Sequence, residues 1–152
     1  IQIPKLLERA GNIEKKGSIT GIYTVLVEGD DMSEPIADSV RSIVDGHIIL
    51  SRDLAHKGHY PAIDVLSSIS RVMYDIVESD HLNMARKLVK VLATYREAED
   101  LINIGAYVDG SDPQIDFAKK MIHKINSFLQ QDINQSITFK ESIVRLKEVL
   151  TE

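Results

Sequence analysis

The sequence predicts an α/β segment followed by an all-α segment. Runs rich in β-branched residues occur only before Tyr60, which confines strands to the first part of the chain. After Tyr60, apolar residues recur at steps of three and four, the spacing of amphipathic helices. With 43% hydrophobic and 27% charged residues, the 152-residue chain also has the composition of a folded domain.

The first elements are predicted from glycine positions and β-branched runs. Residues 3–10 are typical of a helix end, which Gly11 stops, and the polar, Lys-containing run up to Gly17 predicts a loop. Residues 22–27 are apolar and β-branched, and an acidic Gly-Asp-Asp exit follows them. This pattern predicts a buried strand.

A helix and a second strand are expected next. Ser33 can cap a helix that has Pro35 in its first turn and ends before Gly46. Residues 47–51 again resemble a strand. Strand, helix and strand in this order predict a βαβ unit of a parallel sheet. No strand is expected after Tyr60.

The remaining chain is expected to form helices. Two apolar stripes flank a loop at residues 105–113, which predicts a helical hairpin, and Thr138 with Glu141 forms a capping box for a last helix. We place a domain boundary near Arg71 to Ser79, giving domains 1–75 and 76–152. The stripes are Leu88, Val91, Leu92, Tyr95, Ala98, Leu101 and Ile102, and then Ile115, Ala118, Ile122, Ile125 and Leu129.

Composition and motifs exclude several classes of site. The absence of cysteine excludes disulfides, thiolate metal sites and a cysteine nucleophile, and a net charge of −5 argues against nucleic-acid binding. The five histidines show no metal-ligand spacing, so no metal site is expected. The start resembles neither a signal peptide nor a natural N-terminus. No G-x-x-x-x-G-K-[ST] motif occurs, so we expect no complete catalytic set.

Residues 17–73 carry a specific family resemblance. Three segments, VEGDDMSEPIAD, DGHIILSR and HYPAIDVLSSISRVM, occur in the order found in flagellar and type III secretion export ATPases. The more distant catalytic subunits of rotary ATP synthases share the skeleton of this pattern. ARKLVKVLATYREAEDLINIGAY and FLQQD extend the resemblance more loosely. It implies the C-terminal part of a RecA-like P-loop ATPase core plus a C-terminal helical bundle. Both phosphate-binding motifs and a β-barrel domain would lie upstream.

The resemblance assigns a catalytic role to Arg71. By its place in SISR after YPAID, Arg71 matches the arginine that the family inserts into the nucleotide site of a neighbouring subunit. A guanidinium suits this role because it is permanently charged and presents several donors to phosphoryl oxygens. The structural alternative is an ion pair with Asp64 or Asp75.

The resemblance also implies an adenine pocket for ATP. Tyr60 matches the aromatic residue that stacks on adenine, Phe139 matches the other wall more loosely, and Ile133 is a weaker wall candidate. Core packing is the alternative for Phe139. The cofactors would be ATP and Mg²⁺, and both would need residues upstream of this chain.

Two loops match partner-binding segments of the rotary relatives. Residues 29–35 match the loop that faces the central channel, so Asp30 and Asp31 are expected to contact an axial stalk partner. Residues 105–113, with an exposed Tyr107, occupy the position of the stalk-contacting loop at the tip of the helical domain. An ordinary hairpin turn is the alternative there.

The function implied by the resemblance is that of a homohexameric ATPase that drives type III export of flagellar proteins, cytoplasmic and peripheral at the export apparatus. Its partners would be hexamer neighbours, stalk and regulatory proteins, chaperones and export substrates, with membrane association through the export gate. An injectisome ATPase, a rotary ATP synthase subunit and a non-catalytic partner-binding module are the alternatives. The isolated chain is expected to be inactive.

Overall fold

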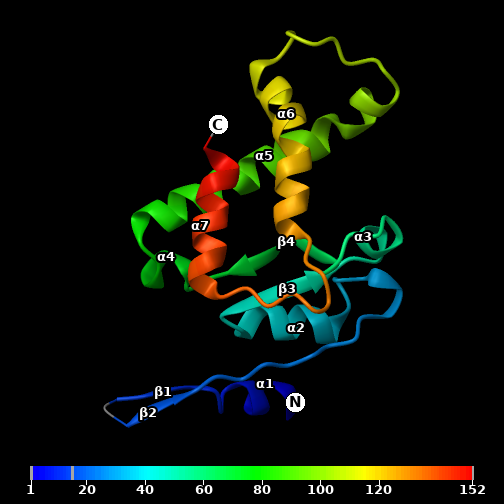
Figure 1. Cartoon of the computed structure of the whole chain (residues 1–152). Helices are drawn as coiled ribbons and strands as arrows, with labels where there is room; N and C mark the ends of the chain where they lie inside the picture. The colour runs from blue at the N-terminus through cyan, green and yellow to red at the C-terminus, as the bar shows by residue number, and fades with distance from the viewer. Residues whose placement is uncertain (1, 15, 152) are drawn as a thin grey trace. The chain divides into compact units, whose positions relative to one another are not determined.

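The computed structural model describes residues 2–14 and 16–151, which divide into two compact units. The first unit extends to His47 and the second begins at Ile48 (Figure 1). The predicted division into domains 1–75 and 76–152 stays a prediction.

The first unit begins with a helix and a short hairpin. Helix α1 (Gln2–Leu7) confirms the predicted N-terminal helix, and β1 (Gly11–Ile13) pairs antiparallel with β2 (Gly17–Ile19). The prediction of a loop from Gly11 to Gly17 was therefore wrong. Gly11 and Gly17 adopt φ angles of 149° and 114°. Glycine reaches such angles without a steric penalty, so the polar run bends back on itself as a hairpin.

The strand predicted at residues 22–27 does not form among the described residues. The segment has no ladder partner there, and Ile22 and Leu26 are almost fully exposed. A strand needs a neighbour that satisfies its backbone donors and acceptors, so strand-like composition alone does not produce one. The segment leads into a short 3₁₀ helix, η1 (Glu28–Asp30).

Helix α2 (Pro35–Ile43) confirms the predicted helix but begins differently. Glu34, not Ser33, is its N-cap, and the backbone N–H of Ser33 instead donates to the Asp31 carboxylate at 2.9 Å. Proline at the first helical position is tolerated because that N–H has no partner within a helix. Helices α1 and α2 pack together, and they contribute the buried residues of this unit, Leu7, Ala37 and Val40.

Strands β3 (Gly46–Leu50) and β4 (Ile63–Ser70) form a two-stranded sheet, and the short α3 (Arg52–His56) lies between them in sequence. The predicted strand near residues 47–51 is confirmed. Its partner is β4 and not residues 22–27, so the expected βαβ unit is not formed. The expectation of no strand after Tyr60 was also wrong. Three serines obscure the β-branched pattern of β4. The hydroxyl groups of two of them, Ser67 and Ser68, make hydrogen bonds within the sheet.

After the short α4 (Met73–Ile76), three long helices complete the second unit (Figure 1). They are α5 (Ser79–Asn103), α6 (Pro113–Leu129) and α7 (Phe139–Leu150). The Asp112 side chain caps α6, and the capping box of Thr138 and Glu141 at α7 is confirmed. None of the described helices is both long and apolar enough to cross a lipid bilayer.

The core of this unit lies among α5, α6 and α7. Both predicted stripes are largely confirmed, but Leu101 of the first is half exposed because the hairpin loop begins beside it. Helix α6 has the most buried face, since Ala118, Met121 and Ile125 have no exposed surface. The core cluster consists of Leu88, Val91, Ala118, Met121, Ile125, Leu146 and Leu150.

The loop between α5 and α6 is tied to the helix that follows it. The Tyr107 hydroxyl lies 2.9 Å from an Asp116 carboxylate oxygen, which also accepts the Gly110 N–H, and Lys119 pairs with Asp109 at 2.7 Å. Tyr107 is consequently half-buried, contrary to the expectation that it is exposed. The predicted stalk contact of this loop stays a prediction.

Truncation of Ile125 tests the core. Ile125→Ala should lower the free energy of unfolding by about 2–5 kcal/mol, because it removes buried methyl groups and leaves a cavity. Val144→Ala, at an exposed position of the neighbouring α7, should change it by less than about 0.5 kcal/mol. Denaturant unfolding followed by circular dichroism measures both. Equal destabilisation by the two variants would contradict this description of the core.

Candidate functional site

Two of the predicted site residues flank one strand. Tyr60 precedes β4 by three positions, and Arg71 follows its last residue, Ser70. The side chains of both residues are exposed. Residues 60–71 are therefore a single continuous segment with a candidate site residue at each end.

The segment around Ile133 contacts the Tyr60 segment. The backbone N–H of Gln131, just after α6, donates to the Tyr60 carbonyl at 3.0 Å. Ile133 lies in the following turn, closed by the Gln135 N–H and the Asp132 carbonyl at 2.9 Å. Tyr60 is 58% exposed and Ile133 is 99% exposed. Both side chains are thus accessible on segments that touch.

Phe139 lies apart from this contact. It is the first residue of α7, and its ring meets the His81 ring of α5 edge to face, with centroids 5.9 Å apart. At 70% exposure the ring is not part of the core, so the alternative of core packing was wrong. The role of Phe139 as a second wall for adenine stays a prediction.

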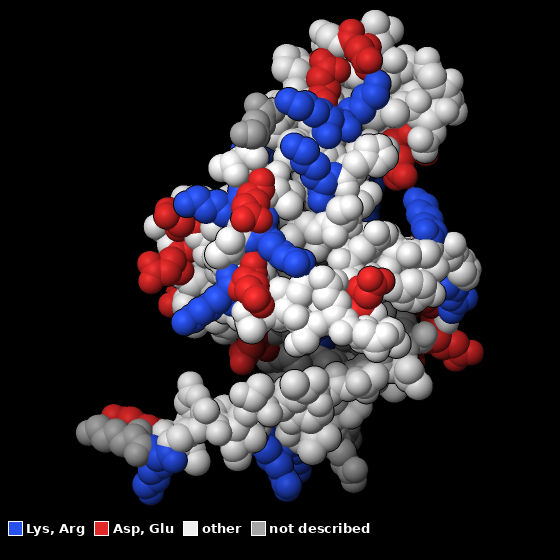
Figure 2. All heavy atoms as spheres, viewed as in Figure 1, with Lys and Arg blue, Asp and Glu red and all other residues white. Residues whose placement is uncertain are grey.

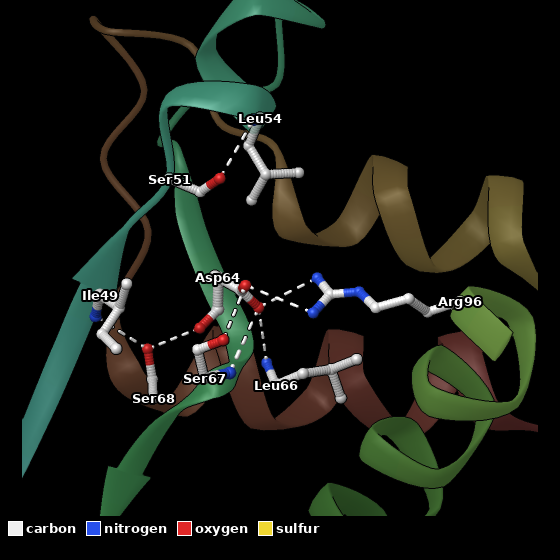
Figure 3. Close-up of polar contacts among 8 residues, drawn as sticks. All are labelled: Ile49, Ser51, Leu54, Asp64, Leu66, Ser67, Ser68 and Arg96. Atoms are coloured by element: carbon white, nitrogen blue, oxygen red, sulfur yellow. Dashed lines mark hydrogen bonds and ion pairs between the residues drawn. The ribbon is translucent and has the colours of Figure 1, made fainter. Parts of the chain in front are cut away.

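The most developed polar network of this unit centres on Asp64 (Figure 3). Arg96 of α5 donates to both carboxylate oxygens, with Nη2 3.1 Å from Oδ1 and Nη1 3.3 Å from Oδ2. The Ser67 hydroxyl donates to Oδ2 at 2.9 Å, and the Leu66 N–H donates to Oδ1 at 3.0 Å. The two-pronged geometry matches the planar guanidinium and makes this a specific contact between β4 and α5.

Ser68 extends the network to β3. Its hydroxyl donates to the Asp64 carbonyl at 2.6 Å and accepts the Ile49 N–H at 3.0 Å (Figure 3). Asp64 therefore connects three elements: β3 through Ser68, its own strand through Ser67, and α5 through Arg96.

The environment of Asp64 favours its charged form. Burial of the side chain acts to raise the pKa of Asp64, but the hydrogen bonds from Arg96 and Ser67 and the charge of Arg96 outweigh it. The pKa consequently lies below the ordinary value of 3.8. The carboxylate is ionised at neutral pH and holds Arg96 firmly.

Sequence reasoning missed the pairing of Asp64 with Arg96. It considered Asp64 only as a partner for Arg71, whereas Arg96 holds the Asp64 carboxylate from 32 positions along the chain. The available signal was the position of Arg96 beside the apolar stripe of α5, directly after Tyr95. That position brings the Arg96 guanidinium to the edge of the buried face of α5.

The described residues contain no cluster of three or more histidines and carboxylates that could hold a metal ion. Basic and acidic side chains are interleaved on the face drawn in Figure 2. That face has no broad basic area of the kind that binds the phosphate backbone of a nucleic acid.

Two family models match the chain in succession. The nucleotide-binding domain of the ATP synthase alpha/beta family matches residues 1–70, and the C-terminal domain of the type III secretion EscN ATPase matches residues 77–148. Together they account for most of the chain.

Individual relatives agree with both matches. The flagellum-specific ATP synthase of Bacillus subtilis is 53% identical over 144 residues, covering 95% of this chain and 33% of that protein. The assembled ATPase EscN of enteropathogenic E. coli has a TM-score of 0.93 at 49% identity, over 99% of this chain and 36% of that one. EscN in complex with its central stalk EscO has a TM-score of 0.87 at 47% identity, over 99% and 35%. The chain spans about a third of the length of the curated relatives that it matches.

The Asp64–Arg96 pair predicts a pH-dependent contribution to stability. Because the pKa of Asp64 is lowered in the folded state, this contribution is complete above the unfolded value of 3.8 and is lost as pH falls through the lower, folded value. Arg96→Met should cost about 1 kcal/mol at pH 7, since the guanidinium is half exposed and screened by water. The cost should shrink towards pH 3. Urea unfolding of both forms across this range tests it, and a cost that does not change with pH would contradict it.

Proposed function

The chain belongs to the family of flagellar and type III secretion export ATPases, and we propose that it forms part of a hexameric ATPase that hydrolyses MgATP to drive type III export of flagellar proteins. The match with flagellar relatives over nearly the whole chain carries the proposal. Residues 1–75 would end the RecA-like core and residues 76–152 would form the helical domain. The family models, which meet between residues 70 and 77, support this division.

In this proposal Tyr60 forms one wall of the adenine pocket. Its ring is accessible, and the contact with Gln131 holds its backbone beside the segment of Ile133. A flat aromatic face and an aliphatic side chain on adjoining segments suit the two faces of a purine base. Phe139, exposed at the start of α7, is retained as a further wall candidate.

Arg71 would act in the site of the neighbouring subunit. It lies at the exposed end of β4, where the strand leaves the sheet and α4 begins two residues later. A residue in this position can extend beyond its own subunit towards a bound nucleotide. Its guanidinium would stabilise negative charge that develops on the transferred phosphoryl group.

The described residues fit the base of the nucleotide better than its metal. They offer accessible apolar faces for adenine but no cluster of carboxylates for Mg²⁺. In the proposed enzyme, the groups that hold the triphosphate and the metal therefore belong to the rest of the protein.

The proposed partners are neighbouring copies in a homohexamer, an axial stalk, regulatory proteins, chaperones and export substrates. A solved structure of the relative EscN with its central stalk EscO supports the stalk. Asp30, Asp31 and the loop at residues 105–113 are the proposed stalk-contacting segments. The protein would work in the cytoplasm, peripheral to the export apparatus, with membrane association through the export gate.

Arg71→Ala in the full-length protein tests the catalytic role. Nucleotide binding should survive, while hydrolysis by the assembled hexamer should fall by about 10³-fold or more, because phosphoryl charge loses its stabilising partner. Arg145→Ala, at an exposed arginine of α7, is the control and should retain normal turnover. Steady-state hydrolysis and nucleotide-binding titrations measure both properties. Normal turnover of the Arg71 variant would remove this residue from the site.

Tyr60→Ala in the full-length protein tests the adenine pocket. The KM for ATP should rise by about tenfold with a smaller fall in kcat, because a stacking contact with a base contributes about 1–3 kcal/mol. Tyr60→Phe keeps the ring and should retain a KM close to that of the unaltered protein. If Tyr60→Ala also leaves KM unchanged, Tyr60 does not contact adenine.

A further inference from the structure

Three polar contacts attach the segment that carries Tyr60 to the helical bundle. Lys57 pairs with Glu99 of α5 at 3.4 Å. The Tyr60 carbonyl accepts the Gln131 N–H at 3.0 Å. The Asp64 carboxylate accepts two hydrogen bonds from the Arg96 guanidinium. The contacts lie before, at and after Tyr60. These contacts hold the backbone on both sides of Tyr60 against groups outside β4, and so restrict where its side chain can lie.

We propose that Arg96 of α5, acting through Asp64, is a positioning residue that fixes Tyr60 for binding of the adenine base. The inference rests on the proposed nucleotide site and extends it, since Arg96 touches no part of the candidate pocket itself. It assigns α5 an indirect role in the affinity of the site for ATP, exerted through β4.

The Asp64–Arg96 contact is the strongest of the side-chain attachments. The Asp64 side chain is only 14% exposed, whereas the side chains of Lys57 and Glu99 are 65% and 35% exposed. Exposed single ion pairs contribute little, but a guanidinium that bonds both oxygens of a largely buried carboxylate also fixes orientation. Loss of Arg96 would remove the two hydrogen bonds that its guanidinium donates to that carboxylate.

The chain between Asp64 and Tyr60 is short and restrained, so movement at one end reaches the other. The Ala62 carbonyl accepts the Ser51 N–H at 2.8 Å, and the Ile63 N–H donates to the Pro61 carbonyl at 2.8 Å. These two bonds limit how far the three intervening residues can absorb a displacement of Asp64. Displacements of about 1 Å are enough to change the function of a site by up to about 100-fold.

A double-mutant cycle in the full-length protein tests the proposal. The KM for ATP is measured for the unaltered protein, Arg96→Met, Tyr60→Ala and the double variant. Arg96→Met alone should raise KM by about three- to tenfold. In the Tyr60→Ala background the same substitution should change KM by less than about twofold, because a ring that is absent cannot be misplaced. If the fold-change in KM of the double variant equals the product of the two single fold-changes, the proposal is overturned.

Two further variants separate positioning from general damage. Arg96→Lys keeps the charge and the stem and should recover part of the loss in KM. Lys119→Met breaks an ion pair of the same helical unit that does not involve β4, and it should leave KM unchanged. If Lys119→Met raised KM as much as Arg96→Met does, the positioning role would be contradicted. The same holds if the KM of Arg96→Lys were as high as that of Arg96→Met.

The outcome also distinguishes this inference from the proposed function. If Tyr60→Ala leaves KM unchanged, the proposed adenine pocket fails, and the positioning role fails with it. If Tyr60→Ala raises KM but Arg96→Met does not, the pocket stands and the positioning role alone is overturned.

Discussion

The second unit depends on the burial of one face of α6 between α5 and α7. Ala118, Met121 and Ile125 have no exposed surface, so the three helices meet at close-packed side chains that tolerate little displacement. This packing fixes the position of Arg96 on α5 and of Gln131 just after α6. Gln131 contacts Tyr60, between α3 and β4, and Arg96 contacts Asp64, near the start of β4. The apolar core thus determines where the polar attachments of the candidate site are placed.

The long helices were predictable from sequence and the pairing of the strands was not, for a physical reason. Helical hydrogen bonds are local, so the apolar spacing of α6 and the capping box at Thr138 specify their elements without reference to the rest of the chain. A strand depends on a partner elsewhere. Residues 22–27 have strand composition but no ladder partner in the described part of the chain, while β4 has three serines and forms a strand. Judged by composition alone, residues 22–27 would be the better strand and β4 the worse, which is the reverse of what the structure has.

The same distinction applies to the candidate site. Tyr60 and Arg71 were found because they lie in a contiguous motif, HYPAIDVLSSISR, and the structure places them at the two ends of one segment. The Asp64–Arg96 pair escaped notice because its members are 32 positions apart and neither belongs to a motif that names the other. Ion pairs that bring distant segments together follow from tertiary packing, and a single sequence gives only weak signs of them.

The placement of Tyr60 and Arg71 at opposite ends of β4 has a mechanical consequence. A strand of eight residues spans roughly 26 Å and is stiff along its length. On the proposed assignments, one end serves the subunit's own nucleotide and the other serves the nucleotide of the adjacent subunit. A displacement of this strand would therefore move both ends, so that, on these assignments, the geometries of two neighbouring nucleotide sites would change together.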